Sequence, residues 1–485
     1  MPPSTPDRRT LLELLAAAGA LALAGCSGDG GETTAPETTD SGATPGTDTS
    51  AGSETTDDET PVDPEEVDPE ASKSAARTLV TRWANGEYEA MREPFTERMR
   101  GAVTVDELRD LWEQLVTDKG AFVSVTRAEY TTSQGYGVVV LTGQFTEGQQ
   151  RFVVTFDGEG RVAGLQVPPP AGEYQAPAYV DRSTFTEQEV SIQATDSCSL
   201  GATLSMPEAE ESVPGVVLVH GSGPHDRDET IGPNEPFRDL SWGLASRGIA
   251  VLRYDKRTAG CSVTEPTLDS VVTDDALAAV DVLRNADRVA DDDVVVVGHS
   301  LGGMVAPRIA ARGGTLAGIA MLAAPARPLA DLVVVQNEYL ADLDGTVTDA
   351  ERAYLEDLRQ QMERAQSGDM GPEETVLGQG RSWWNSLATY DQVETAEGLS
   401  LPTFLLQGGR DYQVDPEADF GRWRDALGGR DSVRFDEYPS LDHLFMPGEG
   451  PSRPADYYEQ DNVAETVVSD LAGWIDGVAG DAGSE

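Results

Sequence analysis

From about residue 183 to residue 480, short apolar runs alternate with segments of helical pattern, and this alternation constrains the fold most strongly. Most runs are almost continuously apolar, which is typical of strands buried on both faces. Such strands form a parallel sheet covered by helices. The region 183–480 is therefore predicted to be α/β, with a doubly wound, mainly parallel sheet. The predicted strands are VPGVVLVH, GIAVLRYD, DDVVVVGHS, LAGIAMLAAP, LPTFLLQGG and SVRFDEYP.

Two further regions interrupt or precede this alternation. Residues 325–399 are acidic and helical in pattern, and because they lie between two predicted strands we expect a helical cap over the carboxyl edge of the sheet. Residues 72–168 combine amphipathic helical patterns with alternating stretches, and their turn at 157–160 predicts a hairpin. They predict a small α+β domain. Because this domain has no histidine, we expect it to serve packing or substrate recruitment rather than catalysis.

The N-terminal segment 1–26 contains adjacent Arg8 and Arg9, an apolar run too short to span a bilayer, and small residues before Cys26. It resembles a twin-arginine lipoprotein signal, which implies export of the folded protein, cleavage before Cys26 and lipidation of its thiol. Residues 27–71 are rich in Ser, Thr, Pro, Asp and Glu and predict a disordered tether spanning about 35 to 40 Å. We therefore expect a lipid-anchored protein on the extracellular face of the cell membrane.

The charge balance excludes one class of partner. Lys and Arg number 35 against 85 Asp and Glu, a net charge of −50, which argues against a nucleic-acid ligand. Lysine occurs only at Lys73, Lys119 and Lys256, a bias that resembles proteins of salt-loving archaea. In molar salt the Debye length is about 3 Å, so repulsion between so many carboxylates is screened. We expect activity to decline in dilute buffer; undiminished activity there would indicate a merely acidic protein.

A candidate nucleophile lies where one predicted strand ends. Residues 294–304 read VVVVGHSLGGM, in which GHSLG fits the pattern Gly-x-Ser-x-Gly between a strand and a helical segment. Glycines flank the serine because side chains at those positions would clash with the adjoining strand and helix. We predict that Ser300 is a nucleophile held on this tight turn at the top of the sheet.

A serine hydroxyl needs a neighbouring base to accept its proton, and histidine is the usual one. The chain has 4 histidines. His299 belongs to the tight turn and is expected to point away from the serine, while His220 and His225 lie in an earlier loop. The chain order nucleophile, acid, histidine leaves only His443 after the acid. We predict that His443 is the general base.

The acid that orients the histidine is expected after the next strand but one. The stretch LPTFLLQGGRDYQVD offers Asp411 and, four residues on, Asp415. We predict Asp411, because Asp415 precedes a proline and fits the cap of the following helix better. Asp442 is too close in sequence to His443 to orient its ring easily.

Acyl transfer also needs N–H donors for the oxyanion. The glycine-rich loop after VVLVH is predicted to supply the N–H of Ser222 or Gly223, and Leu301, directly after the nucleophile, supplies the other. The alternative is an ordinary strand-to-helix turn. This chemistry requires no metal ion or cofactor, and we expect neither.

The cap contains aromatic residues that are candidates for a substrate pocket. Trp383, Trp384 and Tyr390 could form an apolar wall for the acyl or alcohol group, although aromatics at such spacing more often form the core of a cap. Elsewhere, Cys198 and Cys261 are the remaining cysteines. An extracellular setting permits a disulfide between them, but their spacing alone does not show one, so we expect two free thiols by default.

Several motifs in the same order carry a family resemblance: HGSGPHDRDETIGPNEPF, YDKRT, VVGHSLGG, SWWNSLATYD, LLQGGRDYQV and YPSLDHLF. Over 72–480 they resemble α/β-hydrolases related to dienelactone hydrolase, specifically secreted serine esterases with a small N-terminal accessory domain. The resemblance implies carboxylesterase activity with Ser300, Asp411 and His443 as the triad. It also covers the charged stretches at 225–228 and 254–257, whose residues could bind substrate or lock loops through ion pairs, and we expect the locking of loops.

Alternative functions remain open at this point. The same triad could serve a peptidase acting on short peptides, although related peptidases carry a large propeller for which the N-terminal region is too short. A catalytically silent surface binding protein is a second alternative, against which the intact triad argues. The sequence therefore favours a small-molecule ester as substrate.

Overall fold

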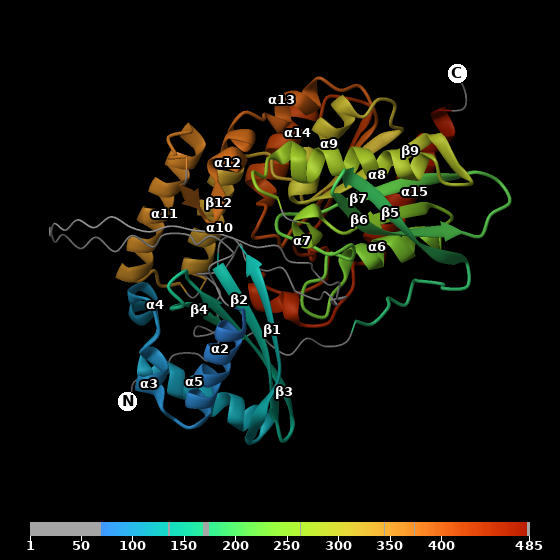
Figure 1. Cartoon of the computed structure of the whole chain (residues 1–485). Coiled ribbons are helices and arrows are strands. Elements are labelled where there is room, and N and C mark those ends of the chain that lie inside the picture. The colour runs from blue at the N-terminus through green and yellow to red at the C-terminus, as the bar shows by residue number, and fades with distance from the viewer. Residues whose placement is uncertain are drawn as a thin grey trace, which may run out of the picture.

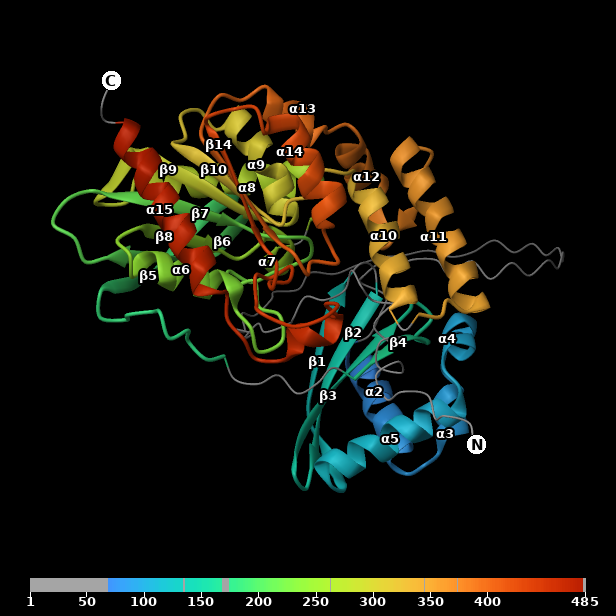
Figure 2. The same cartoon turned by 180° about the vertical axis from the view of Figure 1, so that it is seen from behind.

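The computed structural model describes residues 69–133, 136–167, 174–261, 263–343, 345–372 and 374–482 (Figures 1 and 2). The predicted signal with Cys26, and the predicted tether up to residue 68, lie outside the described residues. The chain forms a small N-terminal unit and a larger C-terminal unit that carries a helical cap. Within the described ranges, no helix combines the length and apolar character needed to cross a bilayer.

The N-terminal unit packs helices against one antiparallel sheet. Its elements are α2 (Pro69–Ala84), α3 (Tyr88–Arg92), α4 (Glu97–Ala102), α5 (Val105–Lys119), β1 (Phe122–Ser133), β2 (Tyr136–Phe145), β3 (Gly148–Phe156) and β4 (Val162–Gln166). The four strands pair in the order β1-β2-β3-β4. Trp83, Trp112 and Phe152 are in ring contact at the centre of its core. The predicted α+β arrangement and the turn at 157–160 are therefore observed.

An eight-stranded sheet forms the centre of the C-terminal unit. Its strands are β5 (Phe185–Thr195), β6 (Cys198–Pro207), β7 (Val213–Val219), β8 (Ala250–Tyr254), β9 (Val289–His299), β10 (Gly318–Leu322), β13 (Thr403–Gly408) and β14 (Val433–Tyr438). The order is β14-β13-β10-β9-β7-β8-β6-β5, parallel from β14 to β8. The strands from β7 onward match the predicted runs and confirm a mainly parallel sheet. The hairpin β5-β6, antiparallel to β8, was not predicted.

Helices cover both faces of this sheet, as a doubly wound fold requires (Figures 1 and 2). They are α6 (Pro236–Ala245), α8 (Asp274–Arg284), α9 (Leu301–Arg312), α14 (Gly421–Leu427) and α15 (Glu465–Ala482). On one face, α8, α9 and α14 contribute Ala279, Met304 and Trp423 to a shared core. On the other face, α6 and α15 contribute Leu240 and Leu471. Helices thus bury both faces of the sheet, and loops lie at its carboxyl edge.

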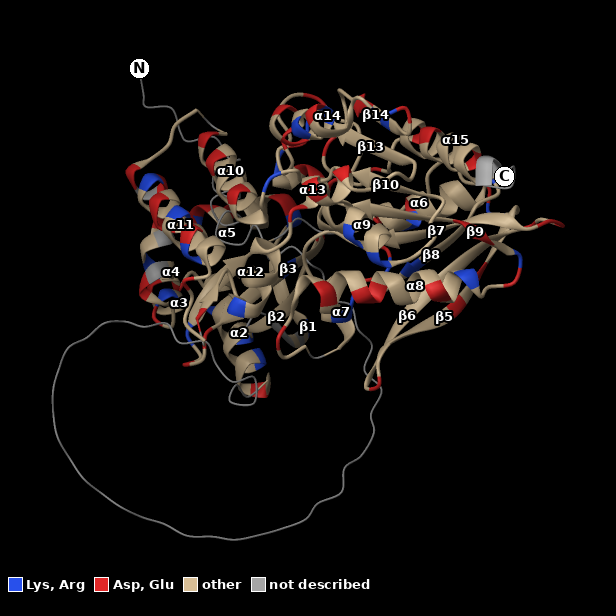
Figure 3. Ribbon diagram, turned by 90° about the horizontal axis from the view of Figure 1, so that it is seen from above, with Lys and Arg blue, Asp and Glu red and all other residues tan. Residues whose placement is uncertain are grey.

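A helical segment between β10 and β13 occupies the place of the predicted cap. Its elements are α10 (Leu329–Asp342), α11 (Asp349–Ser367), β11 (Thr375–Val376), β12 (Gln379–Gly380), α12 (Arg381–Ala388) and α13 (Gln392–Glu397). The helices α10, α11 and α12 enclose a core of their own, which includes Val333, Met362 and Trp384. Helix α13 packs instead on α9. All three ribbon views place α11 beside α4 of the N-terminal unit (Figures 1, 2 and 3).

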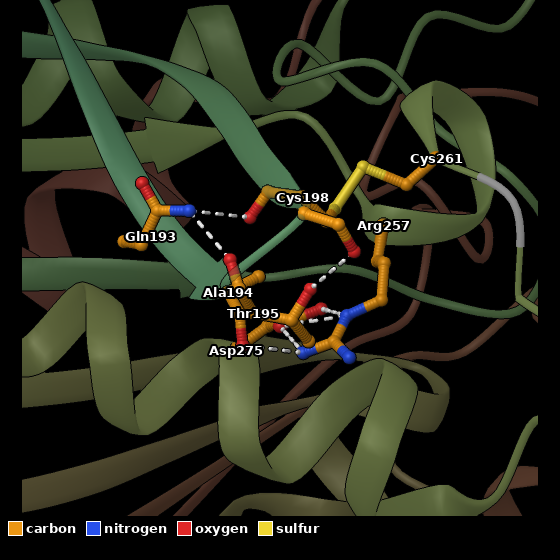
Figure 4. Close-up of a disulfide and its surroundings, with 8 residues drawn as sticks. Gln193, Ala194, Thr195, Cys198, Arg257, Cys261 and Asp275 are labelled. Carbon is orange, nitrogen blue, oxygen red and sulfur yellow. Dashed lines mark hydrogen bonds and ion pairs between the residues drawn. A yellow bond between two sulfur atoms is a disulfide. The ribbon is translucent and has the colours of Figure 1, made fainter.

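Cys198 and Cys261 are joined by a disulfide, which corrects our expectation of two free thiols (Figure 4). Cys198 begins β6, and Cys261 directly follows the short helix α7 (Arg257–Gly260). The fold brings their Cα atoms to 6.0 Å although 63 positions separate them in the chain. The contact depends on where α7 lies against β6, which spacing in the sequence does not reveal.

Replacing both cysteines by serine is expected to lower the free energy of unfolding by about 2 to 4 kcal/mol. The bridge spans 63 positions, so it restricts the unfolded chain far more than the folded one. The measurement is urea unfolding of the double variant and of the oxidised wild type in the same salt. Equal stability of the two proteins would contradict a stabilising bridge, and reduced wild type serves as a second reference.

Candidate active site

Ser300 lies on the turn between the end of β9 and the start of α9. Its backbone has φ 52° and ψ −116°, a strained conformation for a residue other than glycine. The flanking glycines are required sterically: a Cβ at Gly298 would lie 2.2 Å from the Gly302 carbonyl oxygen, and one at Gly302 would lie 2.1 Å from that of Val219. The Ser300 N–H donates to the Leu322 carbonyl at 2.8 Å and holds the turn in place. The turn therefore has the geometry that the motif predicted.

The structure brings His443 and Asp411 together on neighbouring loops. Asp411 follows β13 and His443 follows β14, and His443 Nδ1 lies 2.7 Å from Asp411 Oδ2. Both side chains are buried. The other carboxylate oxygen of Asp411 accepts hydrogen bonds from the N–H groups of Gln413 at 2.8 Å and Val414 at 2.9 Å. Gln407 Nε2 donates to Oδ2 at 3.0 Å, so the carboxylate is fixed from several sides.

The two rival carboxylates are engaged elsewhere. Asp415 caps the turn that follows it, with its side chain accepting from the Ala418 N–H at 2.7 Å. Asp442 accepts from the N–H groups of Leu444 and Met446 at 2.9 and 3.0 Å, within its own loop. Burial raises the pKa of Asp442 to about 6. Of the three candidates, Asp411 is the one whose carboxylate contacts His443.

The glycine-rich loop after β7 runs against Ser300. A Cβ at Gly221 would lie 3.2 Å from the Cβ of Ser300. Ser222 follows directly, and its carbonyl oxygen lies 2.5 Å from His225 Nε2. Leu301 is the first residue of α9, where an N–H has no partner within the helix. The predicted oxyanion donors, the N–H groups of Ser222 or Gly223 and of Leu301, thus belong to segments on either side of Ser300.

Three buried charged or titratable residues, which the sequence did not assign to the site, connect these loops. Glu229 Oε1 accepts from the Gly221 N–H at 2.7 Å, and Lys256 Nζ donates to the Gly221 carbonyl at 2.5 Å. His299 Nδ1 lies 3.0 Å from Glu229 Oε2, and its Nε2 donates to the His443 carbonyl at 3.0 Å. Glu229 and Lys256 lie within the stretches HGSGPHDRDETIGPNEPF and YDKRT that carry the family resemblance, but they come from separate loops, so their shared contact with Gly221 could not be predicted from the sequence.

Burial and pairing set the pKa values around this loop. Burial alone would lower the pKa of His299, but the adjacent Glu229 carboxylate raises it overall. The pKa of Glu229, which burial raises, is lowered to about 2 by His299. Burial lowers the pKa of His220 to about 3 and that of Lys256 to about 8. At neutral pH Glu229 and Lys256 are therefore charged and His220 is neutral, while pairing with Glu229 favours the protonated form of His299.

Two of the proposed pocket aromatics are engaged in packing. Trp384 is 3% exposed, and its Nε1 donates to the Val376 carbonyl within the core of the cap. Tyr390 is 8% exposed, and its hydroxyl donates to the Met304 carbonyl. Trp383 lies differently, because it packs toward the residue pair Leu332 and Val414, the second of which belongs to the loop of Asp411. Of the three, Trp383 is the one that packs against a residue of the Asp411 loop, Val414.

The described residues contain no group of three or more His, Cys, Asp or Glu side chains arranged to hold a metal ion. The histidines near the site have hydrogen-bond or ion-pair partners within the protein instead. His220 Nε2 donates to the Asp226 carbonyl at 3.0 Å, and its ring contacts Phe237 and Tyr254. His220 is therefore a core residue beneath the loop.

Comparison with known proteins agrees with this architecture. The model of the alpha/beta hydrolase family matches residues 216–460, and that of a family of proteins of unknown function, DUF3887, matches residues 76–165. Esterase EstD of Thermotoga maritima is 36% identical over 383 residues, which cover 78% of this chain and 89% of that protein.

Solved structures of esterases also match part of the chain. Est1E from Butyrivibrio proteoclasticus is 17% identical and covers 60% of this chain and 99% of its own, with a TM-score of 0.40. An esterase of Pyrococcus furiosus is 16% identical and covers 64% of this chain and 97% of its own, also with a TM-score of 0.40. The family match over half the chain and the long alignment with EstD carry the assignment. The chain belongs to the alpha/beta hydrolase family and is a hydrolase.

Proposed function

We propose that the protein cleaves carboxylic esters through an acyl-enzyme, with Ser300 as nucleophile, His443 as general base and Asp411 as the residue that orients the base. The observation that carries this proposal is the contact of 2.7 Å between His443 Nδ1 and Asp411 Oδ2. It supports the proposal because an imidazole held this way keeps its Nε2 free to accept a proton. The identity to a protein named an esterase supports the substrate class.

The mechanism has two similar steps. His443 accepts the hydroxyl proton of Ser300 while the serine oxygen bonds to the ester carbonyl carbon, and the carbonyl oxygen takes the displaced electron pair. The N–H of Leu301 and an N–H of the 222–223 segment stabilise this oxyanion. Collapse of the intermediate expels the alcohol, which takes the proton from His443. Water then attacks the acyl-enzyme in the same way and releases the acid.

The substrate enters from the side of the cap, where Trp383 forms part of the wall. Trp383 supports this role because its partners Leu332 and Val414 connect the cap to the loop of Asp411. An apolar wall favours an apolar acyl or alcohol group, since each buried methylene contributes about 0.8 kcal/mol. A small ester with an aliphatic chain is therefore the proposed substrate.

The test is hydrolysis of p-nitrophenyl esters of increasing acyl length in molar salt. We expect kcat/KM to rise by up to about fourfold per added methylene, until the chain fills the space under the cap, and then to fall. Trp383→Ala should move the optimum to a longer chain. Folded protein that cleaves short peptides but none of the esters would favour the peptidase alternative, and inactivity on both would favour a binding protein.

The proposed setting is the outer face of the cell membrane, in a medium of high salt. Acidic residues are spread over the helices and loops of both units, which supports the high-salt medium (Figure 3). For the membrane anchor, the expected result is that expressed protein fractionates with membranes and that Cys26→Ser releases it into the medium or the soluble fraction. Mass spectrometry of the N-terminal peptide should find lipid on Cys26. An unmodified Cys26 in the mature protein would contradict the anchor.

A further inference from the structure

The Gly221 N–H cannot serve the oxyanion, because it already donates to Glu229 Oε1 at 2.7 Å. Gly221 itself lies against the nucleophile, with its Cβ position 3.2 Å from the Cβ of Ser300. The next amide along the chain is that of Ser222. Its direction is set by the peptide group that joins Gly221 to Ser222.

Lys256 contacts this peptide group at the Gly221 carbonyl. Its ammonium group donates to the Gly221 carbonyl at 2.5 Å, and the side chain is 4% exposed. In a planar trans peptide the C=O and N–H bonds point in opposite directions. The Ser222 N–H therefore points away from Lys256. A cation beneath the carbonyl fixes this orientation and draws electron density toward the oxygen, which makes the N–H a stronger donor.

We infer that Lys256 is a positioning residue for ester hydrolysis, which orients and polarises the Gly221–Ser222 peptide so that the Ser222 N–H stabilises the oxyanion. The inference rests on the proposed function and deepens it, because it selects Ser222 over Gly223 as the loop donor. Burial strengthens the effect, since the charge acts across a medium that screens it far less than water.

The neighbours of Lys256 in the sequence have a different role. Arg257 forms a buried ion pair with Asp275, and Asp255 Oδ2 pairs with Arg227 at 2.8 Å. These contacts fit the predicted locking of loops by ion pairs. Lys256 instead directs its ammonium group at a backbone carbonyl. Lysine is rare in this chain, yet the cation that contacts the Gly221 carbonyl is a lysine.

The charge on Lys256 is expected to be lost at moderately alkaline pH. Burial lowers its pKa to about 8, while Glu229 and Asp275 oppose that effect. Lys256 in turn lowers the pKa values of the buried His220 and His225, whose burial already favours their neutral forms. Because a lysine is charged below its pKa, its contribution is present at pH 7 and declines as the pH rises through about 8.

The experiment compares wild type with Lys256→Met, which keeps a long apolar stem without the charge. We expect kcat to fall by about 10- to 100-fold, less than the loss on removing an oxyanion donor outright, with KM changed less than about twofold. The affinity of a trifluoromethyl ketone matched to the best ester should weaken by the same factor as kcat/KM, because Ser300 converts it to an oxyanion adduct. Lys119→Met, in the N-terminal unit, is the matched control.

A purely structural lysine would lower the melting temperature without moving kcat and inhibitor affinity in parallel. Unchanged kcat and inhibitor affinity in folded Lys256→Met would overturn the inference. If that variant does not fold, the pH profile of wild type decides: kcat and ketone affinity should both fall above about pH 8, and constancy of both to pH 10 in folded protein would overturn the inference. Ser300→Ala distinguishes a failure of this inference from a failure of the proposed function, because retained turnover in that variant would refute the proposed function itself.

Discussion

Ser300→Ala is expected to lower kcat for ester hydrolysis by a factor of about 10⁴ or more. The substitution removes the oxygen that forms the acyl-enzyme, and water must then attack the ester without a covalent intermediate. The fold should survive, because alanine occupies the positive φ of 52° at no greater steric cost than serine. The measurement is turnover of the best p-nitrophenyl ester, with melting temperatures of both proteins determined in the same salt.

The control for this prediction is Ser191→Ala, since Ser191 is an exposed serine on β5. It should leave turnover within about twofold of wild type. A fluorophosphonate probe should add one label to wild type and to the control, and none to Ser300→Ala. Labelling of the alanine variant, or turnover near that of wild type, would show that another residue is the nucleophile.

The parallel part of the sheet was predictable because most of its strands are buried on both faces and so read as continuous apolar runs. The hairpin β5-β6 was not predicted, because β5 buries few residues and β6 alternates buried apolar residues with polar or small ones instead of forming a continuous run. Along β5 only Phe185 and Ile192 are buried. On β6 the buried Thr203 and Ser205 hydrogen-bond to charged groups, among them Arg253. Such pairs satisfy the hydrogen-bonding groups of buried polar side chains, so these strand positions are buried without being apolar in the sequence.

The same distinction applies to the site. Ser300, Asp411 and His443 could be proposed from the sequence because the tight turn and the chain order restrict where such residues can lie. The contacts of Glu229 and Lys256 with Gly221 could not be predicted, because each residue reaches Gly221 from a different loop, although both lie within stretches that carry the family resemblance. The candidate catalytic residues lie at strand ends, which can be located in the sequence. The residues that hold a loop in place are determined by contacts between segments far apart in the chain.

Asp411→Asn is expected to lower kcat by about 10⁴, whereas Asp415→Asn should leave it within about twofold. An asparagine at 411 can keep the hydrogen bonds from the Gln413 and Val414 N–H groups through its carbonyl oxygen. Its amide N–H then faces His443 Nδ1, so Nδ1 must accept a hydrogen bond and cannot carry a proton. The proton moves to Nε2, the nitrogen that should receive the proton of the serine, and the imidazole is held in the wrong tautomer.

Asp415 provides a close control, because asparagine caps a turn about as well as aspartate and can keep the bond to the Ala418 N–H, now 2.7 Å. Both substitutions remove one negative charge from the same loop, so a general electrostatic effect would lower both rates alike. A selective loss at Asp411 therefore isolates its contact with His443. The opposite selectivity would transfer the orienting role to Asp415 and require the loop after β13 to rearrange when substrate binds.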